Sequence, residues 1–168
     1  ASPSATNSLS ANKALIVDAV VPTVTNVTSS KDDGYGKIGD VIPINIVFNE
    51  LVNVNTSSGV PQLTLETGNT DVTISYTSGT GTNTLTFNYT VAAGNISTDL
   101  DYVASNSFTF NNSTILDVAN NSANLTLPAP SETNSLGSNK ALVIDGIVGT
   151  ISSVSSSVSD GSYRLGQT

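Results

Sequence analysis

Asn134 to Asp145 reads NSLGSNKALVID, and Asn7 to Asp18 has already supplied a near copy, NSLSANKALIVD, at an offset of 127 residues. The match extends beyond these twelve-residue stretches, since residues 7–41 and 134–168 share 16 identities over 35 positions without a gap. A tandem repeat explains this pattern. We therefore expect residues 1–21 to be the tail of a preceding repeat, residues 22–147 one complete repeat, and residues 148–168 the head of the following repeat.

The composition limits the fold classes and the kinds of partner that we expect for this chain. A chain of 168 residues can bury a core without disulfides, and this one has no cysteine, histidine, methionine or tryptophan. Its abundant threonine and valine favour an all-β fold. The net charge of -8 would repel nucleic acid and anionic lipid, so neither is an expected partner. Membrane insertion is not expected either, because no apolar run approaches the roughly 18 residues that a span requires.

Strict alternation of apolar residues marks the clearest strands. Val41 to Phe48 places every second side chain on one face, and Leu85 to Val91 does the same after a hairpin turn at Ser78 to Asn83. Further strands are predicted around Ala14–Val21, Val24–Val27, Leu51–Val54, Gln62–Glu66, Val72–Tyr76, Leu125–Leu127 and Lys140–Asp145, whereas Ser29–Asp40 is predicted to be a long turn. Eight or nine short strands at spacings of about 8 to 12 residues are typical of a two-sheet antiparallel sandwich.

Several segments together resemble a known repeat type. The runs GYGKIGDVIPINIVFNE, PQLTLETGNTDVTISYTSGTGTNTLTFNYTV, DLDYVA, TILDVANNSANLTLP and NSLGSNKALVID occur in the order seen in tandem Ig-like or cadherin-like repeats of large bacterial surface proteins and adhesins. The resemblance covers residues 22–147 almost completely. It implies an Ig-like antiparallel Greek-key sandwich that serves as an extender or adhesive stalk, and it implies calcium near the junctions between repeats.

Acidic side chains supply the chemistry that calcium requires. Calcium prefers several oxygen ligands from carboxylates, amides and backbone carbonyls. One expected group combines Asp32, Asp33 and Asp40 with Glu50, and another combines Asp99, Asp101, Asp117, Asn120 and Asn121. Asp18 and Asp145 are equivalent linker carboxylates at successive junctions. Asp33, Glu50, Asp101, Asp117 and Asp145 are the candidate calcium ligands. The alternative is that these residues only form turns and solvated surface, because Asp and Asn favour turns without any ion.

No catalytic constellation is visible. A serine triad needs a base such as histidine, which is absent, and the few aromatic residues offer no sugar platform beside a carboxylate pair. We expect no enzymatic activity and no catalytic residue. The expected function is that of a structural or adhesive module in a long extracellular, cell-surface protein or filament. The alternative is a discrete domain that binds carbohydrate or a host protein, with binding residues that the sequence does not identify.

The two overhanging segments give a final expectation about partners. Neighbouring repeats, or copies of the chain arranged head to tail, are the expected partners, and a surface glycan or protein is a further one. The strand predicted around Ala14–Asp18 or the segment Ile151–Ser156 is expected to add to a sheet edge of the same body or of another chain.

Overall fold

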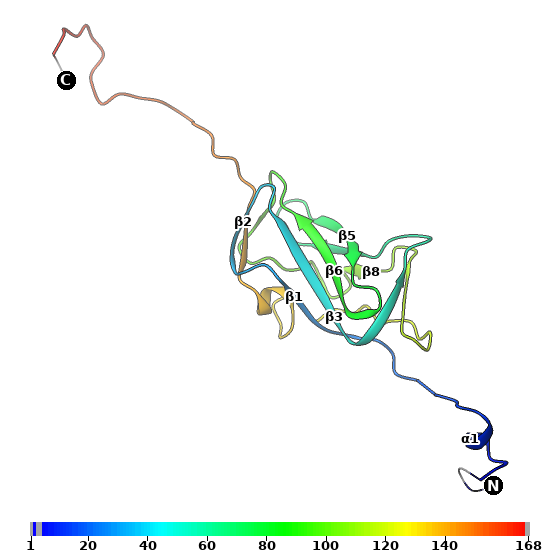
Figure 1. The fold of residues 1–168 in the computed structure, drawn as a ribbon. Helices are drawn as coiled ribbons and strands as arrows, with labels where there is room; N and C mark the ends of the chain where they lie inside the picture. Colours follow the sequence, from blue (N-terminus) through cyan, green and yellow to red (C-terminus); the bar gives the residue numbers. More distant parts are fainter. Residues whose placement is uncertain (1, 3–4, 167–168) are drawn as a thin grey trace.

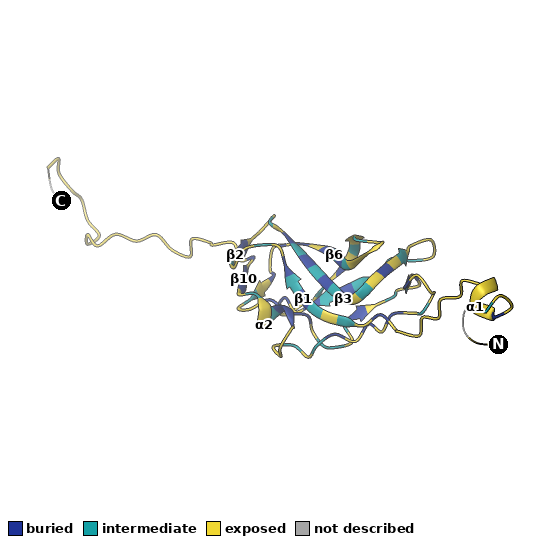
Figure 2. Cartoon of the chain, turned by 60° about the horizontal axis from the view of Figure 1, so that its bottom comes forward, coloured by how far each residue is buried: buried dark blue, intermediate teal, exposed yellow. Residues whose placement is uncertain are grey.

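The computed structural model describes residue 2 and residues 5–166. It shows one all-β body, formed by residues 22–147, with an extended tail at each end (Figure 1). The tails leave from opposite ends of the body. We call these the entry end, where residue 22 joins the body, and the exit end, where residue 147 leaves it (Figure 1). Almost all buried residues belong to the body, and the tails are mainly exposed (Figure 2).

The larger sheet is antiparallel and strongly curled. Its strands lie in the order β1-β3-β6-β5-β4-β8, with β9 pairing the far half of β3. Their bounds are β1 Val24–Ser29, β3 Val41–Asn55, β4 Gln62–Leu65, β5 Val72–Ser78, β6 Thr82–Thr90, β8 Phe108–Thr109 and β9 Thr114–Leu116. Strand β3 has 15 residues and pairs with three other strands, so it is the central element of the body.

The smaller sheet lies at the exit end. It consists of β2 Gly34–Lys37, β10 Leu142–Asp145 and β7 Ile96–Ser97, in the order β2-β10-β7. Strand β10 runs parallel to β2 and antiparallel to β7. The chain therefore contributes β1 to the larger sheet and, after a short turn, β2 to the smaller one. The last strand, β10, closes the smaller sheet against this early segment.

The alternating segments bury the faces that their periodicity predicts. Ile42, Ile44, Ile46 and Phe48 of β3 are at most 1% exposed, and Leu85, Phe87 and Tyr89 of β6 are fully buried. Phe108 joins this core through edge-to-face contacts, with its ring centroid 5.5 Å from that of Phe87 and 6.4 Å from that of Phe48. Burying these side chains removes a large apolar area from water, which is the main favourable contribution to folding.

Two short helices show that the repeated twelve-residue sequence forms the same local structure twice. Helix α1 spans Leu9–Asn12 and helix α2 spans Leu136–Asn139, again 127 residues apart. Ser8 caps α1 by accepting the N–H of Ala11, and Ser135 caps α2 by accepting the N–H of Ser138. In the body, α2 is anchored because Asn139 Nδ2 donates to the Val27 carbonyl of β1 at 2.8 Å.

Three expectations about strands are wrong. Residues 14–21 form no strand and leave Leu15, Ile16 and Val17 at least 67% exposed, so this segment adds to no sheet of its own body. The predicted turn Ser29–Asp40 contains β2, because pairing with β10 outweighs the turn preference of its glycines. Leu125 and Leu127 are buried, yet they lie in irregular chain that makes isolated bridges instead of a strand.

Candidate functional site

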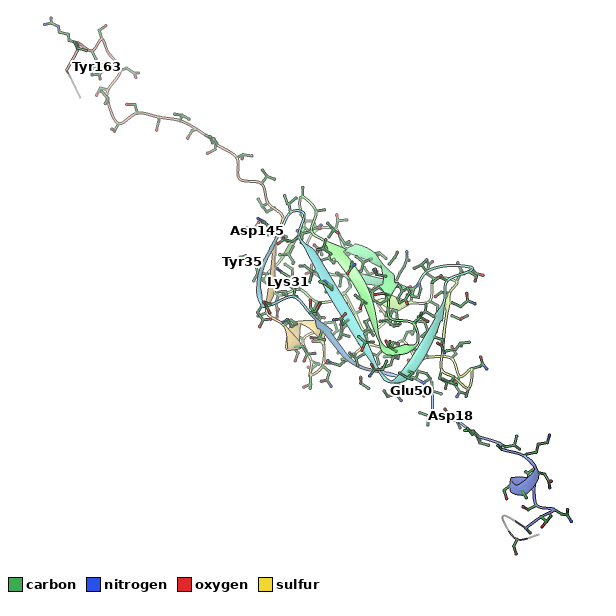
Figure 3. The ribbon with its side chains drawn as sticks, viewed as in Figure 1. Asp18, Lys31, Tyr35, Glu50, Asp145 and Tyr163 are labelled. Atoms are coloured by element: carbon green, nitrogen blue, oxygen red, sulfur yellow. The ribbon has the colours of Figure 1, made fainter. Side chains whose placement is uncertain are left out.

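Three carboxylates from distant parts of the chain meet at the entry end. Asp18 belongs to the first tail, Glu50 lies midway along β3, and Asp117 follows β9 directly. One carboxylate oxygen from each lies within 4.8 Å of the others. In the part of the chain that the structure describes, no other group of three or more possible metal ligands of these types is this close. We call Asp18, Glu50 and Asp117 the junction cluster. Figure 3 labels Asp18 and Glu50, which lie close together at the entry end.

Asp117 is held in place by the loop that it begins. Its Oδ1 accepts the Asn121 N–H at 2.8 Å, and its Oδ2 accepts Asn121 Nδ2 at 2.7 Å. Burial would raise the pKa of Asp117, but hydrogen bonds from the Asn121 side chain and from backbone N–H groups of the loop outweigh burial and hold this pKa below its ordinary value. Asp117 therefore stays ionised at neutral pH and has a fixed orientation.

Asn121 also fastens the tail to the body. Its Nδ2 donates to the carbonyl of Val20 at 3.1 Å and lies 3.3 Å from the carbonyl of Asp18. The next residues continue the attachment, because the Asn124 N–H donates to the Pro22 carbonyl at 2.8 Å. One amide side chain thus connects Asp117 to the incoming linker, and it brings Asp18 beside a residue almost 100 positions further along the chain.

Glu50 completes the cluster under electrostatic strain. Its pKa is raised, first because partial burial disfavours the charged form and then because Asp18 and Asp117 repel it. A divalent cation would reverse this repulsion. Three carboxylates whose oxygens lie within 4.8 Å of one another form the kind of oxygen-rich set that calcium prefers. These residues fit a calcium ion better than a transition metal, which would favour nitrogen or sulfur ligands.

The five candidate ligands from sequence fall into separate places. Glu50 and Asp117 come together in the junction cluster, whereas the sequence predicts them in different groups. Asp145 lies at the opposite, exit end (Figure 3). Asp33 pairs with Lys140, with Nζ 3.0 Å from Oδ1, and this hydrogen bond is the main reason that its pKa is lowered. Asp101 is buried and accepts the N–H groups of Tyr102 and Ser131. Asp33, Asp101 and Asp145 therefore do not join Glu50 and Asp117.

Asp18 is the member of the cluster that the list of candidate ligands lacked. The repeated sequence did identify it as the junction counterpart of Asp145. What the sequence could not show is where Asp18 lies relative to the body. In the structure Asp18 belongs to the first tail and lies against Glu50 and Asp117 of the body.

Comparisons with known proteins add no family. No protein-family model matches the chain, and searches of curated proteins and of solved structures give no significant match. In the described residues, neither helix has the length and apolar character needed to cross a membrane.

Proposed function

We propose that this chain is a non-catalytic repeat module of a long extracellular bacterial surface protein or fibre, and that calcium stiffens the junction between successive repeats. The observation that carries the proposal is the junction cluster, because it joins a carboxylate of the incoming linker to two carboxylates of the body. An ion bound there would fix the direction in which each body continues from the previous one. That is the property that a stalk requires and that a single-domain enzyme does not.

The strand order supports an Ig-like Greek-key sandwich as the finer description of the fold. The first part of the repeat contributes to both sheets, with β1 beside β3 and β2 beside β10. The last strand therefore returns to lie next to the beginning of the domain, a long-range closure typical of Greek-key connections. This arrangement also places the two chain ends at opposite ends of the body, as tandem extension requires (Figure 1).

Calcium titration of thermal unfolding tests the proposal, and the chain supplies its own matched control. Asp18 and Asp145 are equivalent residues with the same local turn: Asp18 Oδ1 accepts the Val20 N–H at 3.0 Å, and Asp145 Oδ1 accepts the Ile147 N–H at 3.1 Å. In the described chain, only Asp18 lies against the Glu50 and Asp117 carboxylates, whereas Asp145 ends β10 at the exit end. We expect calcium to raise the Tm of the parent protein and of Asp145→Asn, and to have little effect on the Tm of Asp18→Asn.

Two results would overturn the calcium proposal. One is a parent Tm that does not change at millimolar calcium, since a ligand that binds only the folded state must raise stability by mass action. The other is an equal response in Asp18→Asn and Asp145→Asn, which would place the ion elsewhere. Isothermal titration calorimetry on the same three proteins would measure the number of bound ions independently of unfolding.

A further inference from the structure

An apolar groove at the exit end is left open to solvent. It has a volume of about 420 Å³, and its walls include Tyr35, Ile96, Val143 and Asp145. Tyr35 is 74% exposed and Ile96 is 41% exposed. Exposed apolar side chains that gather around one concavity indicate a binding surface more strongly than the same residues scattered singly.

The groove follows from the register of the smaller sheet. Tyr35 of β2 lies opposite Val143 of β10, and Ile96 of β7 lies opposite Asp145. Leu142 and Ile144 face the core, so the alternate residue Val143 faces outward. The outer face of this sheet thus presents the apolar side chains of Tyr35, Val143 and Ile96 next to the charged Lys37 and Asp145. Asp145 marks the edge where the chain leaves the body (Figure 3).

Repeat symmetry identifies what lies beside that edge in a tandem array. Asp145 is the counterpart of Asp18, and the two residues form the same side-chain turn with the residue two positions on. Asp18 contacts the cluster that contains Asp117 of the following body. In a tandem array, Asp145 would therefore reach the equivalent of Asp117 in the next repeat. The groove that Asp145 lines is then adjacent to the loop that follows this aspartate.

The linker has too little slack to hold the two bodies apart. The Gly146 N–H donates to the Asn95 carbonyl at 2.8 Å, and the Gly146 carbonyl accepts the Gly94 N–H at 3.0 Å, so the preceding body holds this residue on both sides. The carbonyls on either side of the equivalent position, those of Asp18 and Val20, are held by Asn121 of the following body. If both sets of contacts form at one junction of a tandem array, consecutive linker residues would be bound alternately by the two bodies.

We propose that the groove receives the Val118 loop, residues 118–120, of the following repeat. Val118 directly follows Asp117 and is 79% exposed, although it is a large apolar residue at a body end. The groove and the loop each present apolar side chains, each is exposed when the body is isolated, and the two are adjacent when Asp145 takes the position of Asp18. This inference rests on the proposed tandem function, and it names the partner of the exit end as a second copy of the same fold.

A two-body chain tests the contact. Residues 1–147 followed by residues 21–168 keep the 127-residue period and retain Gly146 at the junction. The first copy then has a groove at the junction, while the groove of the second copy remains free. Since the natural chain has no cysteine, one cysteine introduced on each body can carry a spin label, and pulsed EPR can measure the distribution of distances between the bodies.

We expect Tyr35→Ser in the first copy to broaden this distance distribution, and the same substitution in the second copy to leave it unchanged. Val118→Ser should have the opposite dependence, because only the second copy presents its loop to the junction. The two junction substitutions combined should broaden the distribution no further than either one alone. Both side chains are mostly exposed, so the single bodies should unfold at the parent Tm.

Equal effects in both copies, or no effect in either, would overturn the groove proposal. Binding of an apolar dye or a glycan as readily at the first-copy groove as at the free second-copy groove would also overturn it, since the groove would then be open to other ligands. Such results would leave the calcium proposal intact if the single chain still responds to calcium through Asp18. The converse result is also possible. If Tyr35→Ser in the first copy broadens the distance distribution in EGTA, but calcium does not raise the Tm, the calcium proposal is refuted and the groove proposal stands.

Discussion

Leu15 and Leu142 occupy equivalent positions in two copies of one sequence but lie in opposite environments. Leu142 is fully buried in β10, whereas Leu15 is 67% exposed in the first tail. The sequence around each residue forms the same capped helical turn, so local preference does not explain the difference. Strand pairing explains the difference, because β10 lies between β2 and β7, whereas residues 14–18 have no strand beside them.

We expect Leu142→Ala to destabilise the body by about 2 to 5 kcal/mol, the usual cost of removing a buried leucine side chain. Leu15→Ala makes the same chemical change at a solvent-exposed site and should alter stability by less than about 0.5 kcal/mol. Urea unfolding followed by fluorescence or circular dichroism measures both. Similar losses for the two variants would show that the first tail packs on a body in solution.

Glu50→Gln should change the sign of its effect with calcium. At pH 7 in EGTA, the substitution removes a carboxylate whose charged form is disfavoured in the folded state, so we expect the Tm to rise. In millimolar calcium it removes a ligand, and the Tm should fall below that of the parent. Glu132→Gln, at an exposed position outside the cluster, is the control for charge alone. If Glu50→Gln changes the Tm in the same direction in EGTA and in calcium, Glu50 is not a calcium ligand in the junction cluster.

The pH dependence of the Glu50 effect follows from the same shift. A raised pKa means that the folded state takes up this proton more readily than the unfolded chain, whose value is near 4.5. The loss of stability that the charged form of Glu50 causes is therefore absent below the pKa of the unfolded chain, and it develops as pH rises through the pKa of the folded state. In EGTA, the difference in Tm between Glu50→Gln and the parent should narrow as pH is lowered from 7 toward 4.5. A difference that widens on acidification would be inconsistent with repulsion at Glu50.

Gly146→Ala should destabilise the body by roughly 1 to 3 kcal/mol, the range for inserting an atom into a close-packed site. A Cβ there would lie 2.4 Å from the Ala92 carbonyl oxygen and 2.7 Å from that of Asn95, so the backbone would have to move. Gly149→Ala is a close control, because a Cβ at Gly149 meets nothing within 4 Å. Chemical denaturation compares the two, and equal stabilities would show that the linker is loosely attached at the exit end.

Alkaline unfolding should report on Tyr89. Burial raises its pKa to about 12, and its hydroxyl donates to Asn95 Oδ1 at 3.0 Å. Above pH 10 the unfolded chain loses this proton while the folded chain keeps it, so stability should fall between pH 10 and about 12. Tyr89→Phe should weaken that dependence and cost about 0.5 to 1.5 kcal/mol at neutral pH through the lost hydrogen bond. Tyr35→Phe, at an exposed position, should change neither quantity.

The parts of the fold that sequence predicts are those with a strong local pattern. Ile42 to Phe48 and Leu85 to Tyr89 alternate strictly, and each of these apolar faces is buried as expected. Strand β2 has no such pattern, because GYGK becomes a strand only when β10 arrives from more than 100 residues away. Residues 14–18 have a strand-like composition but lack a partner. Local preference therefore fails at positions where a distant pairing decides the conformation.

The junction cluster was predictable only in part. Glu50 and Asp117 were recognisable as possible ligands from their residue type and their places beside turns. The proximity of Glu50 and Asp117 depends on the pairing of β9 with the far half of β3, and the presence of Asp18 beside them depends on the attachment of the linker by Asn121. Neither fact leaves a signature in spacing. Asp33 is an equally plausible ligand by residue type and position, but in the structure it forms an ion pair with Lys140 and lies outside the cluster.

The parallel pairing of β10 with β2 has a mechanical consequence. Tension between the two tails would pull β1 toward the entry end and β10 toward the exit end, along the direction in which these strands run (Figure 1). Each strand would have to slide past its neighbour, so the hydrogen bonds of a pair would bear the force together and would not open one after another. The body is therefore built to resist shear, and a rupture under tension would have to break β1 from β3 or β10 from β2 in a single event.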